Sequence, residues 1–230
     1  MPTDPPHTLS NFDEGLKVIK EEILLMSSSA VENLSNAVHG LLERDEARIK
    51  TAVDGDETVN QYERTIGENG TEVLVRFAPV ATDLRSVLGA IKISTNLERI
   101  SDEAEHIARR AKKLTKKPEA EAAAMIEPIF RIAEALVTDA ARAYADGNVD
   151  LALTLYARDL ELDDMHKAAI KKLTRAMESD VDALRSYLHL IFVVRCLERI
   201  GDHAVNIGEE VVYIHRAADI RHVGPAALDS

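Results

Sequence analysis

Aromatic residues are scarce in this chain of 230 residues: there is no tryptophan, and phenylalanine and tyrosine together make up 4% of the sequence. Alanine, leucine, glutamate, arginine and lysine are abundant instead, which favours helices over β-sandwiches or barrels. Hydrophobic residues still account for 46% of the chain, enough to form a core. The composition therefore predicts a globular, all-α protein.

Cysteine and long apolar runs are also missing. Cys196 is the single cysteine, so no disulfide can form within the chain. The first residues, MPTDPPHTLS, lack the basic and apolar stretches of a secretory signal. The longest apolar run, Leu188 to Val194, is interrupted by His189 and is far shorter than the roughly 20 residues that cross a bilayer. We expect a cytoplasmic protein without a transmembrane segment.

Positive charge is in deficit, with 28 Lys and Arg residues against 40 Asp and Glu residues and a formal net charge of −12. Proteins that bind nucleic acid generally present a basic surface to the phosphates, so we expect no nucleic-acid partner. Cationic partners, including metal ions, suit the chain better. The glycine-rich phosphate loop and the GxSxG, HExxH and CxxC motifs are absent, so we predict that the protein is not an enzyme.

Apolar residues recur at helical spacing over six long segments, which are separated by proline, glycine or short polar turns. The predicted helices cover residues 10–42, 45–77, 82–114, the stretch from after Pro118 to 146, 149–177 and 180–215. Asp54-Gly55-Asp56 is a candidate disturbance within the second. Short connections predict that consecutive helices pack antiparallel. Residues 1–9 and 218–230 are predicted to be flexible tails.

The two halves of the chain repeat one pattern at an offset of 100 residues. Leu97-Glu98-Arg99-Ile100-Ser101-Asp102 reappears as Leu197-Glu198-Arg199-Ile200-Gly201-Asp202, and Leu84-Arg85-Ser86 reappears as Leu184-Arg185-Ser186. Such self-similarity indicates a duplicated structural unit. We therefore predict two tandem three-helix bundles of long antiparallel helices. They would span residues 10–116 and 119–217.

Acidic pairs stand out within this repeat. Glu98 and Asp102 are four residues apart and project from one helix face, and Glu198 and Asp202 repeat the arrangement. A bridging cation would offset the repulsion within each pair, since carboxylate-rich sites suit Mg, Ca, Mn and iron. The alternative is that the acids only form a solvated helix face. Solvated acids need not recur in register whereas ligands would, so the repeat favours metal binding.

Four further residues that could carry chemistry are not matched by the same residue type in the other copy. Cys196 corresponds to Asn96, which favours a buried structural cysteine. His203 corresponds to Glu103 and is interpreted as a polar residue of the helix surface. Glu103-x-x-His106 fits the spacing of carboxylate-bridged di-iron or ferritin-like bundles, but its counterpart is His203-x-x-Asn206. That class of protein remains the alternative interpretation.

The duplicated Leu-Glu-Arg-Ile-x-Asp, each copy preceded by Leu-Arg-Ser, together with Pro79-x-x-x-Asp83-Leu84-Arg85, resembles the PhoU family over about residues 10–217. The resemblance implies ExxxD or DxxxD motifs that hold multinuclear iron or zinc clusters, with Mg or Mn as other candidates. A weaker echo, Asp56-x-x-x-Asn60 with Asp159-x-x-x-Asp163, supplies the second motif of each bundle. Asn60 departs from the acidic pattern and offers only a carbonyl oxygen. The implied metal ligands are Glu98, Asp102, Glu198, Asp202, Asp159, Asp163, Asp56 and Asn60.

The same resemblance implies a function without catalysis. A PhoU-like protein would act as a negative regulator of phosphate uptake and phosphate-starvation signalling. It would bridge the ATPase of a phosphate ABC transporter and a membrane sensor histidine kinase, favouring the repressing state of the kinase. We expect a homodimer that meets the membrane only through these partners, with metal clipping the helices of each bundle together and shaping a docking surface.

Overall fold

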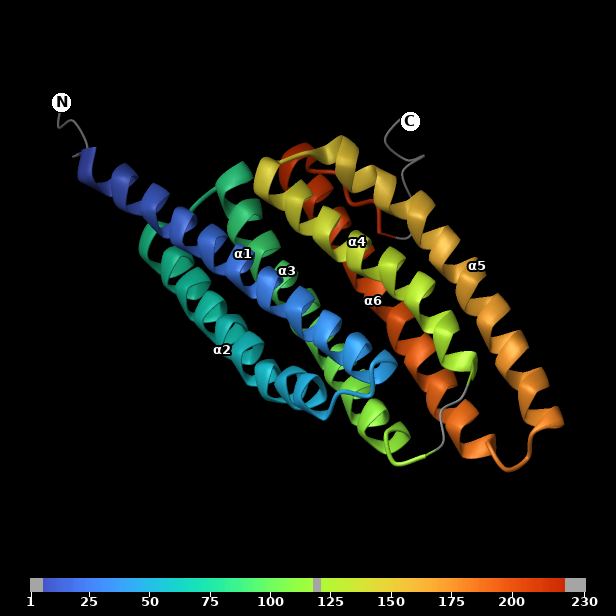
Figure 1. Ribbon diagram of the computed structural model, residues 1–230. Coiled ribbons are helices and arrows are strands. Elements are labelled where there is room, and N and C mark those ends of the chain that lie inside the picture. The colour runs from blue at the N-terminus through green and yellow to red at the C-terminus, as the bar shows by residue number, and fades with distance from the viewer. Residues whose placement is uncertain (1–5, 118–120, 222–230) are drawn as a thin grey trace.

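The computed structural model describes residues 6–117 and 121–221, and six long helices account for most of them. The helices are α1 (Pro6–Leu42), α2 (Glu46–Phe77), α3 (Ala81–Leu114), α4 (Ile126–Asp146), α5 (Val149–Ser179) and α6 (Leu184–Arg216). A short 3₁₀ turn, η1 (Glu121–Met125), leads into α4. The first three helices pack as one bundle and the last three as a second, as Figure 1 shows. The predicted fold of two tandem three-helix bundles is confirmed.

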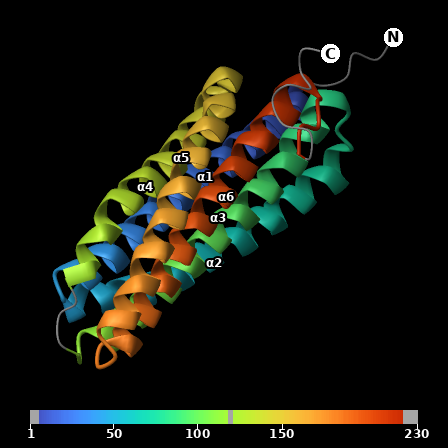
Figure 2. The ribbon, with the colours of Figure 1, turned by 90° about the vertical axis from the view of Figure 1, so that its right-hand side faces the viewer.

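The two bundles lie side by side and share a long interface. The most extensive contact between them joins α3 to α6, and α1 also contacts α4. Figure 2 shows α2, α3, α6 and α5 following one another across one layer, with α1 and α4 forming the other. The third helix of each repeat therefore lies at the centre of the molecule, next to its counterpart.

Residues at the predicted breaks end and begin the helices. Asp45 caps α2 by accepting hydrogen bonds from the backbone N–H groups of Ala47 at 2.8 Å and Arg48 at 3.2 Å. Gly147 takes a left-handed φ of 62° after α4, a conformation that costs glycine little. Asn148 then caps α5 by accepting from the N–H of Leu151 at 3.0 Å. These caps let long helices reverse direction over few residues.

The repeated apolar stripe forms the core. Its members in both copies are between 0% and 1% exposed: Leu97, Ile100, Ala104, Ile107, Leu197, Ile200, Ala204 and Ile207. They belong to one apolar cluster that runs through both bundles. The duplication therefore preserves a buried face, which explains why it is readable in the sequence. Within the described ranges, no helix is both long enough and apolar enough to cross a membrane.

The predicted tails and the second helix need correction. α1 begins at Pro6, so residues 6–9, predicted to be part of a tail, are helical. α2 is continuous through Gly55, because the missing side chain makes room for Asn33 of α1, whose Cγ would lie 2.9 Å from a Cβ at this position. Beyond α6, Ile220 is 1% exposed and packs near Val211 and Val212. Residues 1–5 and 222–230 lie outside the described residues.

Two helix starts are later than predicted. α4 begins at Ile126, after the 3₁₀ turn, and residues 118–120 lie outside the described part. α6 begins at Leu184 instead of Asp180. Asp180 ends α5, and its side chain accepts a hydrogen bond from the N–H of Ala183 at 3.1 Å, which stabilises the turn between the helices.

Candidate functional site

The C-terminal acidic cluster consists of Asp159 and Asp163 on α5 with Glu198 and Asp202 on α6. Burial, followed by the charges of Asp202, Asp163 and Glu198, raises the pKa of Asp159 to about 7. Burial, Glu198 and Asp163 likewise raise the pKa of Asp202 to about 6, although this side chain is the more exposed of the two. Such mutual shifts require the carboxylates to lie near one another. The structure therefore brings all four predicted residues together.

The N-terminal acidic cluster consists of Asp56 and Asn60 on α2 with Glu98 and Asp102 on α3. Burial and then the charge of Asp102 raise the pKa of Glu98, while burial and then Asp56 raise the pKa of Asp102. The Asn60 amide donates to Asp56 Oδ2 at 3.0 Å. These four predicted residues are also brought together, but one negative charge is replaced by a hydrogen-bond donor.

Asp56 accepts a second hydrogen bond, from a side chain that has no counterpart in the C-terminal acidic cluster. The Ser101 hydroxyl donates to Asp56 Oδ1 at 2.8 Å and accepts from Asn33 Nδ2 at 3.1 Å. Gly201 takes the place of Ser101 in the second copy, and a Cβ there would lie 2.7 Å from Asp159 Oδ1. The glycine therefore leaves space for the carboxylate of Asp159 without a side-chain donor for it.

One residue near each cluster escaped the sequence analysis. Glu63 on α2 adds its charge to the causes that raise the pKa of Glu98, and it accepts a hydrogen bond from Thr95 Oγ1 at 3.2 Å. His166 occupies the corresponding position on α5 at the offset of 103. Its Nε2 is buried without a hydrogen-bond partner in the described chain. The offset that relates Asp56 to Asp159 could have revealed both residues.

The side chains best placed to share a metal ion lie outside the two acidic clusters. Among the described residues, one trio has ligand atoms that all lie within 4.8 Å of one another: Glu103 and His106 on α3 with Cys196 on α6. None of the three belongs to the predicted metal set. The acidic clusters form no trio this close in the described part of the chain, so a cation would have to draw their oxygens together.

Three expectations from the sequence concern residues where α3 packs against α6. Cys196 is 9% exposed, so the prediction that it is buried is confirmed. Glu103 and His106 face Arg199 and Cys196 of α6 instead of a second Glu-x-x-His pair, unlike a ferritin-like centre. His203, expected at the helix surface, is only partly exposed: its Nδ1 lies 3.2 Å from Asn96 Oδ1, because α3 packs against α6 here.

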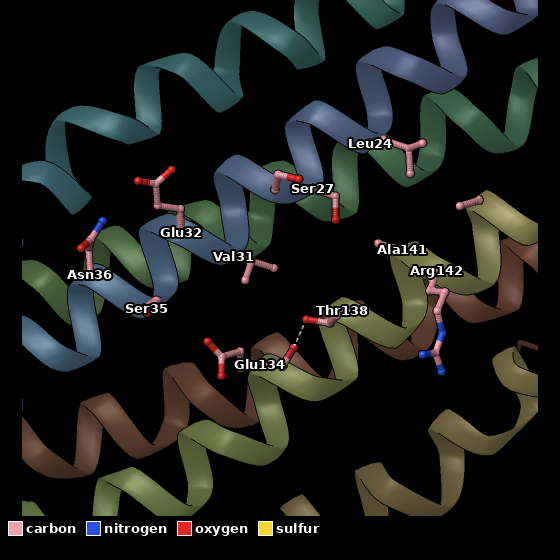
Figure 3. A pocket seen from close by; sticks show the side chains of 12 residues that line it. Leu24, Ser27, Val31, Glu32, Ser35, Asn36, Glu134, Thr138, Ala141 and Arg142 are labelled. Carbon is pink, nitrogen blue, oxygen red and sulfur yellow. Dashed lines mark hydrogen bonds between the residues drawn. The ribbon is translucent and has the colours of Figure 1, made fainter.

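A groove of about 570 Å³ lies between α1 and α4 and contains none of the predicted ligands. Figure 3 shows that side chains from both helices line it, among them Glu32, Ser35 and Glu134. The Thr138 hydroxyl donates to the backbone carbonyl of Glu134 at 2.8 Å. The groove and the acidic clusters are therefore different features of the molecule.

Comparison with known sequences decides the family. The family model described as the PhoU domain matches residues 23–111 and 126–211, which together exceed half of the chain. The chain belongs to the PhoU family. The first PhoU match contains the whole N-terminal acidic cluster, and the second contains the whole C-terminal cluster.

PhoU relatives match over nearly the whole length. The phosphate-specific transport system accessory protein PhoU homolog of Pseudomonas aeruginosa is 34% identical over 95% of this chain and 90% of the relative. The corresponding PhoU of Escherichia coli K12 is 30% identical over 97% of this chain and 92% of the relative.

Two crystal structures share the PhoU fold. PhoU from Pseudomonas aeruginosa superposes with a TM-score of 0.88 at 34% identity, covering 90% of this chain and 100% of that chain. The phosphate transport system regulatory protein PhoU from Streptococcus pneumoniae gives a TM-score of 0.84 over 90% of this chain and 98% of that chain. At 22% identity, the latter supports the fold alone.

Proposed function

We propose that this PhoU-family chain is a cytoplasmic, non-enzymatic negative regulator of phosphate uptake. Its relatives are named as accessory proteins of phosphate-specific transport, which supports a role beside the transporter. It would couple the ATPase of a phosphate ABC transporter to a sensor histidine kinase, as the family resemblance implies. The observation that carries the proposal is the presence of one acidic cluster at the equivalent place in each bundle.

Both clusters are proposed as sites for iron or zinc, with Mg or Mn as alternatives. The donor set of the C-terminal cluster fits such ions, since it offers four carboxylates, and burial followed by the charges of the neighbouring carboxylates raises the pKa values of Asp159 and Asp202. The buried, unpartnered Nε2 of His166 supplies an imidazole nearby, and imidazole with carboxylate suits iron and zinc. Asp56 already accepts hydrogen bonds at both oxygens, so the N-terminal cluster would bind more weakly.

A bound cation would act on the surface and need not take part in any reaction. It would join α2 to α3 in one bundle and α5 to α6 in the other, because each cluster takes residues from both helices. It would also reduce the local negative charge of a chain whose net charge is −12. Both effects would change the surface that a partner protein meets, which is how metal occupancy would influence docking.

Metal content tests the proposed sites. Untagged protein would be analysed by inductively coupled plasma mass spectrometry beside the variant Glu198→Ala, Asp202→Ala. The matched control is Glu68→Ala, Glu72→Ala, an acidic pair with the same four-residue spacing on α2 and outside both clusters. We expect the cluster variant to lose the metal held by the C-terminal cluster and the control to keep it. A wild-type protein that stays metal-free after incubation with these ions would refute the proposed metal sites and favour a metal-free helical scaffold.

Phosphate uptake tests the regulatory role. The gene would be deleted in its own host, and labelled phosphate uptake and a phosphate-starvation reporter would be measured in phosphate-rich medium. We expect both to rise after deletion and to fall again when the wild-type chain is restored. Unchanged uptake and reporter activity after deletion would refute the role. Co-purification with the transporter ATPase and the kinase, and sedimentation of the purified chain, test the proposed partners and the proposed homodimer.

A further inference from the structure

Two polar trios lie along the boundary between the bundles, where α3 packs against α6. The interface trio is Glu103, His106 and Cys196, and the amide trio is Asn96, His203 and Asn206. The repeat offset of 100 residues relates them position by position: each residue of one trio has its counterpart in the other. The two trios therefore occupy equivalent places in the duplicated fold but differ in chemistry.

The amide trio is held together by hydrogen bonds between uncharged groups. Asn96 Oδ1 lies 3.2 Å from His203 Nδ1 and accepts from Asn206 Nδ2 at 3.3 Å. Asn96 Nδ2 donates to the backbone carbonyl of Lys92 at 3.0 Å. Burial lowers the pKa of His203, which keeps its imidazole neutral. This arrangement needs no ion.

The interface trio carries a charge and different donor atoms. The side chain of Glu103 is 5% exposed, and its Oε1 lies 2.5 Å from Nη1 of Arg199. Its other oxygen, Oε2, lies 3.6 Å from Nδ1 of His106. The Cys196 thiol hydrogen-bonds Glu103 from α6, and burial with this bond raises the pKa of the thiol. One carboxylate oxygen is thus paired with Arg199 while the other faces the imidazole.

We propose that the interface trio is a third metal site, separate from the two acidic clusters, for a borderline divalent ion such as Zn²⁺. The Cys196 thiolate, an imidazole nitrogen of His106 and a carboxylate oxygen of Glu103 are the ligand types that Zn²⁺ takes, with water in the fourth position. On binding, the thiol proton leaves to solvent as the Zn–S bond forms.

The surroundings fit an ion that arrives from solvent and is then held firmly. The side chain of His106 is 55% exposed, which opens a path to the buried carboxylate. Arg199 holds the remaining oxygen of Glu103, the kind of outer partner that orients a ligating carboxylate. Because the ligands come from α3 and α6, this ion joins one bundle to the other, whereas the acidic clusters each lie within one bundle. The inference does not depend on the proposed function.

Cobalt spectroscopy of the full-length, metal-stripped protein tests this site. Cys196 is the single cysteine, so a near-ultraviolet thiolate-to-cobalt charge-transfer band can arise only from the interface trio. We expect the intensity of the band at saturation to correspond to one thiolate-bound Co²⁺ per chain, and the band to disappear when Zn²⁺ is added. His106→Ala should weaken Co²⁺ binding by at least the roughly 10- to 100-fold that loss of an outer partner costs at metal sites. Because the side chain of His106 is partly exposed, we expect this variant to fold, so weaker binding would report the loss of a ligand.

Two control variants separate this site from the rest of the molecule. His203→Ala changes the amide trio at the equivalent interface position and should leave the band intact. Glu198→Ala, Asp202→Ala removes half of the C-terminal acidic cluster and should also leave it intact, so failure of the acidic sites and failure of this one are distinguishable. The proposal would be refuted if the wild-type protein showed no charge-transfer band. It would also be refuted if the Co²⁺ affinity measured from the band were unchanged in His106→Ala. The interface trio would then be only a polar contact between the helices.

Discussion

Ser101 and Gly201 hold the same position in the two repeats, and the difference between them makes the two acidic clusters unequal. Ser101 donates to Asp56 Oδ1 at 2.8 Å. A Cβ at Gly201 would lie 2.7 Å from Asp159 Oδ1, so the second copy gives its carboxylate space in place of a donor. Hydrogen bonds thus compensate the charge of Asp56, whereas the pKa of Asp159 is raised to about 7.

Removing this hydroxyl should destabilise the first bundle. Ser101 is 0% exposed, and Ser101→Ala leaves both Asp56 Oδ1 and Asn33 Nδ2 without their partner. We expect a loss of about 1–3 kcal/mol in the free energy of unfolding, measured by urea denaturation. Ser94→Ala is the control, since its similarly buried hydroxyl bonds only the carbonyl of Ile91 on its own helix. Equal losses in the two variants would show that the link to Asp56 contributes little.

Two glycines of α2 should respond to alanine in opposite directions. Alanine is favoured over glycine in a helix by about 1 kcal/mol. A Cβ at Gly67 would lie in open space with no packing neighbour within 4 Å, so Gly67→Ala should raise the free energy of unfolding by roughly that amount. At Gly55 a Cβ would lie 2.9 Å from Asn33 Cγ, so Gly55→Ala should lower it.

The measurement for both glycine variants is urea denaturation at one pH, with the midpoint and the slope compared to wild type. Gly55→Ala should also weaken the bond from Asn33 Nδ2 to Ser101 Oγ, which is 3.1 Å long in the native protein. The double variant Gly55→Ala, Ser101→Ala should therefore lose less than the sum of the two single losses. A stabilised Gly55→Ala protein would mean that Asn33 moves aside freely.

The sequence predicts those features that depend on spacing within a helix. Glu98 with Asp102 and Glu198 with Asp202 share helix faces by their four-residue spacing, and short connections bring the matching helices alongside. The disturbance expected at Gly55 is wrong, because only the three-dimensional approach of Asn33 shows why the helix needs a glycine there.

Contacts between the two repeats cannot be predicted from the sequence pattern. Cys196 meets Glu103 and His106 because α3 and α6 pack at one particular register, which no local periodicity encodes. The partial burial of His203 is not predicted for the same reason, since its partner Asn96 lies 107 residues away along the chain. Helix periodicity identifies a buried face but does not say which residues of the neighbouring helix oppose it.

Restoring the missing charge should strengthen the N-terminal acidic cluster. Asn60→Asp replaces the amide that donates to Asp56 with a carboxylate, matching Asp163 in the other bundle. We expect tighter binding of a divalent ion and, without metal, lower stability from the added repulsion. Calorimetric titration in a Glu198→Ala, Asp202→Ala background reads this cluster with the other one disabled. Asn60→Ala is the control, and tighter binding by that variant as well would assign the gain to the lost amide instead of the new charge.

The metal-free protein should lose stability as the pH rises from about 4 to about 7, and Asp159 should account for part of the loss. An unfolded aspartate has a pKa of about 3.9. Burial and the neighbouring carboxylates raise the pKa of Asp159 to about 7 in the folded chain. Between these values the folded state binds more protons than the unfolded state, so the free energy of unfolding falls as the pH increases.

Asp159→Asn, which resembles the protonated carboxyl at every pH, should flatten this dependence. Urea denaturation in the presence of a chelator, repeated across this pH range, gives the slope for wild type and variant. The control is Asp164→Asn, because the side chain of Asp164 is 84% exposed and lies outside the C-terminal acidic cluster. Asp202 keeps its own raised pKa in the variant, so some slope should remain. Parallel curves for wild type and Asp159→Asn would mean that Asp159 is charged in the folded protein throughout this range, and the case for an uncompensated C-terminal cluster would fail.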